Sequence, residues 1–424
     1  MVSWRQRIRD LESQIELLKK ENDDLRRRLL VYENPHTPPS KSKKEPPRKE
    51  SSGKLGAPIG HPKYERKEPE PTGSVEYLEE TCPKCANKLG KPFKTERILE
   101  EEIPEPQPVE VIEHLVNHYM CQHCNEHIIA KNNAPSGRFG KNVLTHVTLL
   151  KYEDRLPLRK TVNSLERHYN ISITDVGIFN LTNQVSRKLE RPYQEIILRI
   201  RNAEVVYVDE TEIKVNGVTY HLWTFVTDSG VVFVIRKSRS KSVLEEVLGE
   251  KFQGVICCDG WTAYSQYSSN LQRCWAHLLR EAKDLAENYS EFEGFYNSFK
   301  IIFKKIKKLR EKPFSLKTRE EWKERLTLEV EQIIYQMNAY KEFRKFATKV
   351  KNGLEHWFTC LINLFVEPTN NTAERALREL IVQRKIMGGL RREKGAKIME
   401  IITSVIATLK MRELPTFQTI KSYL

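Results

Sequence analysis

The chain has 424 residues, which is more than one ordinary hydrophobic core needs, so several packed units can share its functions. Lysine and arginine outnumber aspartate and glutamate by 71 to 57, and the sequence pI is about 9.2. This excess favours a polyanionic partner, nucleic acid ahead of a ribosomal or membrane surface. The first residues hold no apolar signal region, and no stretch of about 18 apolar residues occurs, so we expect no membrane association and a cytoplasmic, nucleoid-associated protein.

Residues 1–33 predict a coiled coil that joins two chains. Apolar side chains alternate at spacings of four and three, with one polar interruption, at Trp4, Ile8, Leu11, Ile15, Leu18, Asn22, Leu25, Leu29 and Tyr32. An asparagine at such a core position can fix the register of the partner helices, which favours a parallel homodimer. A single amphipathic helix packed on its own chain is the alternative.

Residues 34–72 are rich in Pro, Lys, Ser and Glu and poor in large apolar side chains. Such a segment cannot bury enough surface to order itself, so we expect a disordered basic linker. The run from Lys41 to Lys49 could contact DNA phosphates, but a solvated linker is the commoner meaning of such a run.

Residues 73–135 contain two C-x-x-C pairs, Cys82 with Cys85 and Cys121 with Cys124. Four thiolates can bind one Zn²⁺ tetrahedrally, and four protein ligands leave no open position, so this zinc would be structural. Strand-like sequence between the pairs predicts a zinc ribbon-like domain. Four free cysteines in an ordinary core are the alternative, which the repeated spacing disfavours.

Residues 136–192 show three helical patterns, the last closed by Pro192, and the last two predict a helix-turn-helix-like DNA-binding domain. Ser172 or Thr174 would cap its second helix. The polar residues offered to DNA are Asn180, Asn183, Gln184, Arg187 and Lys188. Helix pairs joined by short turns are common, so a purely structural pair is an equal alternative.

From residue 193 to 424 we expect the catalytic domain. Three strand patterns, a helix and a fourth strand follow Glu204, with Asp209 at the end of the first strand and Asp259 just past the fourth. If these strands are neighbours, as in an RNase H-like sheet, the two carboxylates converge. Two close carboxylates repel each other unless a cation lies between them, which indicates Mg²⁺ or Mn²⁺.

Four sequence blocks resemble the insertion sequence 66 family of DDE transposases: Tyr207–Thr211, Cys258–Tyr264, Cys274–Arg280 and Asn370–Arg378. The resemblance extends over nearly the whole chain, because members of that family also carry a leucine-repeat helix, a linker and a two-knuckle zinc segment in this order. It implies that Asp209, Asp259 and Glu374 form an acidic triad on an RNase H-like fold. It also implies double-stranded DNA partners, both terminal inverted repeats and target DNA, and accessory proteins encoded by the element.

Glu374 stands on an amphipathic helix pattern that could direct its carboxylate toward the two aspartates, with Arg375 and Arg378 near that face to hold phosphates. Such a triad would bind two metal ions for phosphodiester cleavage and strand transfer. Strand-end capping for the aspartates, and a surface pair between Glu374 and Arg378, are the structural alternatives.

Cys274 and His277 form a C-x-x-H motif that we expect to support the active site by packing or hydrogen bonding, because two ligands alone bind zinc poorly. A Lys- and Glu-rich helical insertion is expected over about residues 278–367, to hold DNA or simply as a solvated helical pair.

The predicted fold is thus multidomain α/β. Two rival functions stay open: an RNase H-like nuclease that cuts without joining, and a non-catalytic zinc-containing DNA-binding regulator.

Overall fold

A computed structural model describes residues 11–22, 68–101, 105, 107–130, 135 and 137–424, which fall into two units, Met1–Gln107 and Pro108–Leu424. In the first unit residues 11–22 form a helix whose side chains are all exposed. The other coiled-coil positions, before residue 11 and beyond residue 22, and nearly all of the linker lie outside the described residues. Within the described residues, no helix is both long and apolar enough to cross a bilayer.

The second unit begins with a small antiparallel hairpin, β1 (His118–Met120) and β2 (His127–Ile129), followed by four helices. These are α2 (Lys141–Tyr152), α3 (Leu158–Tyr169), α4 (Asp175–Lys188) and α5 (Glu190–Arg201). Thr174 caps α4 by accepting a 3.1 Å hydrogen bond from the Gly177 backbone N–H, as one of the two predicted caps.

The sequence does not predict helix α5, because Pro192 is expected to end the helical region. The proline instead stands in the first turn of α5. Backbone N–H groups in the first turn of a helix have no partner within the helix, so the N–H that proline lacks is not missed there. A proline after a helix therefore marked the start of the next helix, with Leu189 between α4 and α5.

A five-stranded mixed sheet with the order β5-β4-β3-β6-β7 forms the centre of this unit. Its strands are β3 (Val205–Val215), β4 (Val218–Val226), β5 (Val231–Arg236), β6 (Val255–Cys258) and β7 (Leu271–Arg273). The first three form an antiparallel meander, and β6 and β7 are parallel to β3 and to each other. The expected adjacency of the strands that carry Asp209 and Asp259 is confirmed, since β3 and β6 pair directly.

The expectation that Asp209 ends its strand is wrong, because β3 continues to Val215. Asn216 and Gly217, both at positive φ, make the tight turn into β4, and these two residues favour that turn since they tolerate the left-handed region. The strand is therefore long, but only its beginning, Val205 to Tyr207, pairs with β6.

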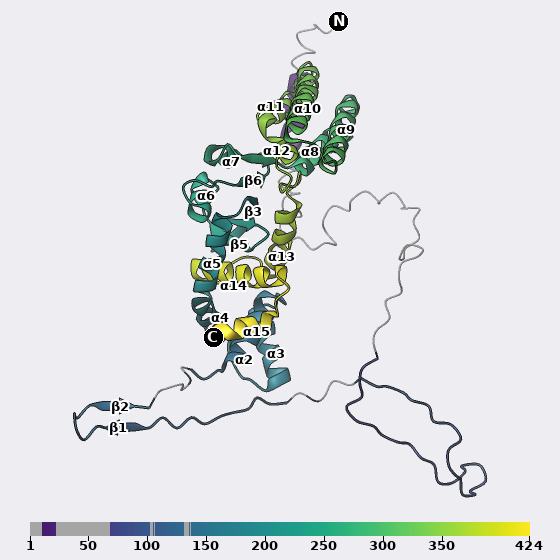
Figure 1. The fold of residues 1–424 in the computed structure, drawn as a ribbon, viewed down its shortest axis with the longest axis vertical. Helices are drawn as coiled ribbons and strands as arrows, with labels where there is room; N and C mark the ends of the chain where they lie inside the picture. Colours follow the sequence, from purple (N-terminus) through teal and green to yellow (C-terminus); the bar gives the residue numbers. More distant parts are fainter. Residues whose placement is uncertain (1–10, 23–67, 102–104, 106, 131–134, 136) are drawn as a thin grey trace. The chain divides into compact units, whose positions relative to one another are not determined.

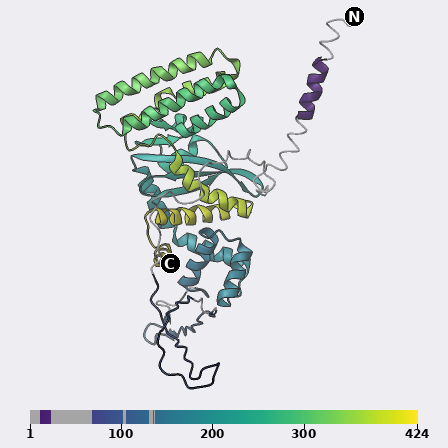
Figure 2. The ribbon, with the colours of Figure 1, turned by 90° about the vertical axis from the view of Figure 1, so that its right-hand side faces the viewer.

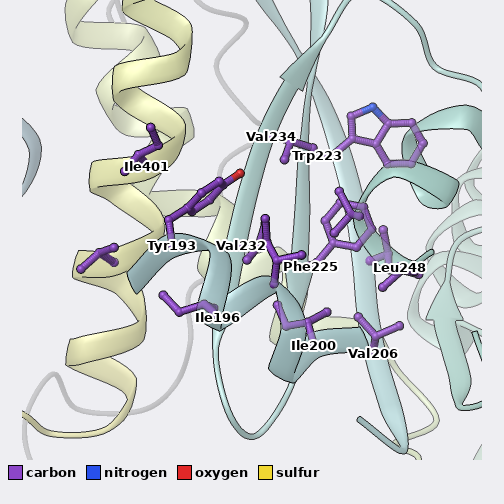
Figure 3. Close-up of a cluster of buried hydrophobic side chains, with 14 of the residues drawn as sticks. Tyr193, Ile196, Ile200, Val206, Trp223, Phe225, Val232, Val234, Leu248 and Ile401 are labelled. Atoms are coloured by element: carbon purple, nitrogen blue, oxygen red, sulfur yellow. The ribbon is translucent and has the colours of Figure 1, made fainter. Parts of the chain in front are cut away.

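Helices cover both faces of the sheet (Figure 1). One face packs against α5 and α6 (Lys241–Leu248), where side chains from β3, β4 and β5 meet Tyr193, Ile196 and Ile200 of α5 (Figure 3). The opposite face packs against α13 (Asn371–Met387). The remaining helices of the sheet region are α7 (Thr262–Tyr267), α14 (Glu393–Met411) and α15 (Thr416–Tyr423).

Helix α14 also closes the edge strand β5 with a row of polar side chains. Thr408 and Ser404 accept hydrogen bonds of 3.0 and 2.9 Å from the backbone N–H groups of Val231 and Phe233, and Glu400 accepts one of 2.8 Å from that of Ile235. A four-residue spacing on a helix and a two-residue spacing on a strand both span about 6 Å, so the two series stay in register.

Between β7 and α13 the chain forms a separate helical core. It consists of α8 (Trp275–Asn288), α9 (Glu293–Arg310), α10 (Leu316–Met337), α11 (Arg344–Lys351) and α12 (Thr359–Ile362), with short 3₁₀ turns at Ser290–Phe292, Lys341–Phe343 and Leu354–His356. The two longest, α9 and α10, run side by side (Figure 2). Trp275 and Trp357 pack edge to face at the base of this core, next to the sheet.

Candidate active site

The pairing of β3 with β6 brings Asp209 and Asp259 to one place. Val205 lies opposite Val255 and Tyr207 opposite Cys257, and Asp209 and Asp259 each follow this last pair by two residues. Neighbouring strands lie about 4.8 Å apart, and residues two apart on a strand share a face. Asp209 therefore lies on the same face as Tyr207, the face that α13 covers.

Burial is the main cause that raises the pKa of Asp209 to about 7, and the negative charges of Glu210, Asp259 and Glu374 add to it. Its carboxylate accepts a 3.0 Å hydrogen bond from the Glu210 backbone N–H. Among the described residues, no lysine, arginine or histidine forms an ion pair with Asp209 or Asp259. This carboxylate pair has the charge and the donor atoms that a hard divalent cation requires.

The loop after β6 fixes the carboxylate of Asp259. Its Oδ1 accepts a 2.8 Å hydrogen bond from the Trp261 backbone N–H, and Arg273 donates to its backbone carbonyl at 3.0 Å. A Cβ on Gly260 would come within 2.9 Å of Lys349 Cε and 3.1 Å of an Arg273 nitrogen. Two basic side chains thus approach this loop closely, one of them from α11 of the helical segment.

Asn370 anchors the helix that carries Glu374. Its side chain is fully buried and donates to the Val208 carbonyl at 2.7 Å, while its backbone N–H donates to Cys274 Sγ at 3.1 Å. These bonds tie the start of α13 to β3 and to the start of α8. Cys274 thereby has the hydrogen-bonding environment of a supporting residue, and Asn370 is a member of the site that the sequence analysis did not single out.

The carboxylate of Glu374 is engaged by basic groups of α8. It forms an ion pair with Arg280, and His277 Nε2 lies 3.6 Å from it. Burial is the main cause that lowers the pKa of His277, and its Nδ1 is a buried nitrogen without a hydrogen-bond partner. In this arrangement the carboxylate of Glu374 contacts basic groups of α8, while its charge still adds to the raised pKa of Asp209.

Within the described part of the chain, one group of potential ligands has all its ligand atoms within 4.8 Å of one another: Cys274, His277 and Glu374. Asp209, Asp259 and Glu374 do not form so tight a group there. A site for two ions about 4 Å apart does not require it, because its outer carboxylates can bind different ions. Glu374 could therefore belong to either of two sets of metal ligands. One set has only carboxylate oxygens, from Asp209, Asp259 and Glu374, and the other includes the sulfur of Cys274.

Glu210, next to Asp209 but on the opposite face of β3, is the centre of a second polar network. Only 2% of its side chain is exposed, and Arg239 donates to its Oε1 at 2.9 and 2.6 Å. Tyr264 donates to its other oxygen. Burial raises the pKa of Glu210, and the charge of Asp259 adds to this. The sequence blocks contain Glu210 and Tyr264, but only the folded chain shows that they meet.

Each C-x-x-C pair forms a local knuckle. The backbone N–H groups of Ala86 and Asn125 donate to the carbonyls of Cys82 and Cys121 at 2.8 and 2.9 Å. Backbone hydrogen bonds to the sulfur atoms, from Lys84 and Cys85 in one knuckle and from Cys124 and His123 in the other, lower the thiol pKa of Cys82 and Cys121. Such bonds favour the thiolate, the form that binds a metal.

The basic residues proposed as DNA contacts lie on two helices. Arg187 and Lys188 are exposed in the last turn of α4, where Asn180 is also exposed and Asn183 and Gln184 are half-buried. Arg375 and Arg378 are exposed on α13. None of these side chains is needed for the core, so all four basic groups are free to meet solvent or a polyanion.

A five-stranded mixed sheet covered by helices makes this chain an α/β protein, and its excess of basic residues suits a polyanionic partner. A family model described as Transposase IS66 family matches residues 136–398, more than half of the chain. The chain therefore belongs to the IS66 transposase family, as its sequence blocks indicated. Membership implies an enzyme that cleaves and transfers DNA, and it suggests use of a divalent metal. No curated protein shows significant similarity to the chain.

Proposed function

We propose that this transposase uses Asp209, Asp259 and Glu374 as a DDE-type site that binds two Mg²⁺ or Mn²⁺ ions, on an RNase H-like core. The observation that carries the proposal is the pairing of β3 with β6, which ends at Tyr207 and Cys257, two residues before Asp209 and Asp259. The charge of Asp259, which helps to raise the pKa of Asp209, supports the close approach of the two carboxylates. The sheet order, three antiparallel strands followed by two parallel ones, supports the RNase H-like assignment. The helical segment α8 to α12 is then an insertion into that core before the helix of the third carboxylate.

The two ions, when bound, would activate a water or 3′-hydroxyl and stabilise the leaving oxygen. The protein contributes fixed ligands. Asp209 and Asp259 are already oriented by backbone N–H groups, so binding a cation requires little rearrangement of them. Glu374 requires more, because its carboxylate must separate from Arg280 before it can bind an ion. Arg280 then has a free guanidinium beside the scissile phosphate.

The decisive experiment is Asp209→Asn, assayed with Mg²⁺ on DNA that carries the element ends. We expect loss of cleavage and strand joining, by about a thousandfold or more since a metal ligand is lost, with end binding retained. The matched control is Glu212→Gln, an exposed acid on the same strand, which should retain both reactions.

The same assay separates the rival functions. A nuclease would cleave but would not join a pre-cut end to target DNA, and a non-catalytic regulator would leave every activity of Asp209→Asn unchanged. Retained joining in this variant would therefore disprove the proposed site.

Four further assignments are proposals for the parts of the chain beyond the acidic triad. Residues 136–192 would bind terminal inverted repeats through Arg187 and Lys188, supported by their exposure. Residues 73–135 would hold structural Zn²⁺ through Cys82, Cys85, Cys121 and Cys124, supported by the lowered thiol pKa in each knuckle. Residues 1–33 would form a homodimer, and Arg375 and Arg378 would contact target DNA or element-end phosphates.

A further inference from the structure

Trp261 is an exposed aromatic side chain fixed beside the acidic site. It stands two residues after Asp259, and its backbone N–H donates to that carboxylate at 2.8 Å. Its exposed fraction is 37%, whereas Trp223 and Trp275 are fully buried. Its indole N–H donates to the Arg239 carbonyl at 3.0 Å. The ring therefore has a fixed orientation although the residue is 37% exposed.

Arg239 covers one face of this indole. Its guanidinium carbon lies 4.1 Å from the ring centroid, a close cation–π contact. The guanidinium is itself held by the buried Glu210, to which Tyr264 also donates. Glu210, Arg239 and Trp261 thus form one connected group. It extends from a buried carboxylate to an exposed ring.

A single exposed apolar side chain is ordinary on a protein surface, so exposure alone assigns no function. Here, however, two groups of Arg239 hold the ring, its carbonyl and its guanidinium, while the Asp259 carboxylate holds the Trp261 backbone N–H. A ring held in this way loses little freedom when a flat partner stacks on it. A nucleobase is such a partner, and every base has a π face for an aromatic ring.

We propose that Trp261 is a stacking site for an unpaired nucleobase next to the scissile phosphate. The inference rests on the proposed DDE site, because it is the position of Asp259 that brings the DNA end to this loop. A base adjacent to the cleaved bond must leave the duplex for a fixed ring to reach its face. The stacked base would hold the DNA end so that its phosphate stays over the carboxylates, while Arg239, paired with Glu210, would keep the ring in place.

The test is a coupling experiment between the ring and the base. Binding of a labelled pre-cut DNA end is measured by fluorescence anisotropy, with Ca²⁺ in place of Mg²⁺, for the full-length protein and for Trp261→Leu and Trp261→Phe. Each is tested on ends with an abasic site at successive positions around the cleavage site. With the unmodified protein, one abasic position should weaken binding roughly 10- to 100-fold. Trp261→Leu should weaken binding of the intact end by a similar factor and should be insensitive to that abasic site.

Trp261→Phe should recover most of the loss, since it keeps a π face, and Tyr335→Leu, an 83% exposed aromatic on α10, should behave like the unmodified protein. The proposal is wrong if Trp261→Leu keeps the abasic sensitivity, or if Leu and Phe variants lose binding equally on every substrate, which would indicate a damaged loop. An unmodified protein that binds ends but fails to cleave them with Mg²⁺ would instead contradict the DDE site.

Discussion

The ion pair between Arg280 and Glu374 occupies the carboxylate that the proposed mechanism needs for metal binding. Glu374 lies partly buried, with 26% of its side chain exposed, while Arg280 is 56% exposed. The pair therefore has the modest stability of a solvent-screened interaction. A cation that binds Glu374 must compete with Arg280 and, to a lesser extent, with His277.

We predict that Arg280→Gln lowers the Mg²⁺ concentration that gives half-maximal cleavage. A pair of this exposure corresponds to roughly a two- to fivefold change. The measurement is a Mg²⁺ titration of the cleavage rate at constant DNA. Lys283→Gln, which removes a surface pair with Glu287 on the same helix, is the control and should leave the titration unchanged. A higher Mg²⁺ requirement in Arg280→Gln would show that Arg280 assists metal binding instead of opposing it.

Individual residues of the site were predictable to different degrees. Asp209, Asp259 and Glu374 stood out because they lie in sequence blocks that the family shares. The residues that support them did not stand out. Asn370 bonds to the Val208 carbonyl and to Cys274, and Glu210 bonds to Arg239. These partners are distant in the sequence, so no local spacing marks them. Buried polar residues of this kind become meaningful only when their hydrogen-bond partners are known.

At the scale of elements, local patterns identified most strands of the sheet, and the two differences have physical causes. The strand β3 is longer than expected because an Asn-Gly turn joins it directly to β4. The helix α5 was missed because a proline is compatible with the first turn of a helix as well as with its end. The order of strands in the sheet follows from tertiary pairing, which no single segment encodes.

Helix α2 buries a charged residue at a position where an apolar side chain would give a more stable fold. Lys151 is only 8% exposed, and its ammonium donates to the Met387 sulfur of α13 at 3.1 Å. Burial lowers the pKa of Lys151 to about 8. Folding disfavours the charged form of Lys151, so burial of the ammonium group lowers the stability of the protein. This loss of stability is complete below about pH 8 and disappears as the pH rises toward the ordinary pKa of 10.5.

We predict that Lys151→Met raises the free energy of unfolding at pH 7 by roughly 1–3 kcal/mol, the equivalent of the pKa shift after allowance for relaxation. The gain should shrink when the same urea unfolding experiment is repeated near pH 9.5, because the lysine is then mostly neutral. Lys141→Met, an exposed lysine on the same helix, should show neither effect. A gain independent of pH would mean that burial of the charge is not its cause.

At the scale of the whole molecule, transposition requires two DNA ends to be held together, and a homodimer through residues 1–33 would achieve this. The described part of that segment is a fully exposed helix over residues 11–22, with apolar side chains such as Leu18 61% exposed. An apolar stripe without a partner among the described residues of its unit is suited to pairing with a second chain.

We therefore predict that deletion of residues 1–33 converts a dimer into a monomer, measured by light scattering. The Asp209-dependent cleavage of a single end should persist, because the deletion leaves the catalytic sheet intact, while joining that needs paired ends should fall. The coiled-coil prediction is wrong if the mass of the particle does not change.

The polar row that α14 presents to β5 has a consequence for assembly. Its Thr408, Ser404 and Glu400 side chains already engage the outward N–H groups of Val231, Phe233 and Ile235. An incoming extended peptide finds no free donors on these residues, so the sheet resists fibril growth and strand swapping at this margin. Copies of this chain are therefore not expected to pair with one another through β5.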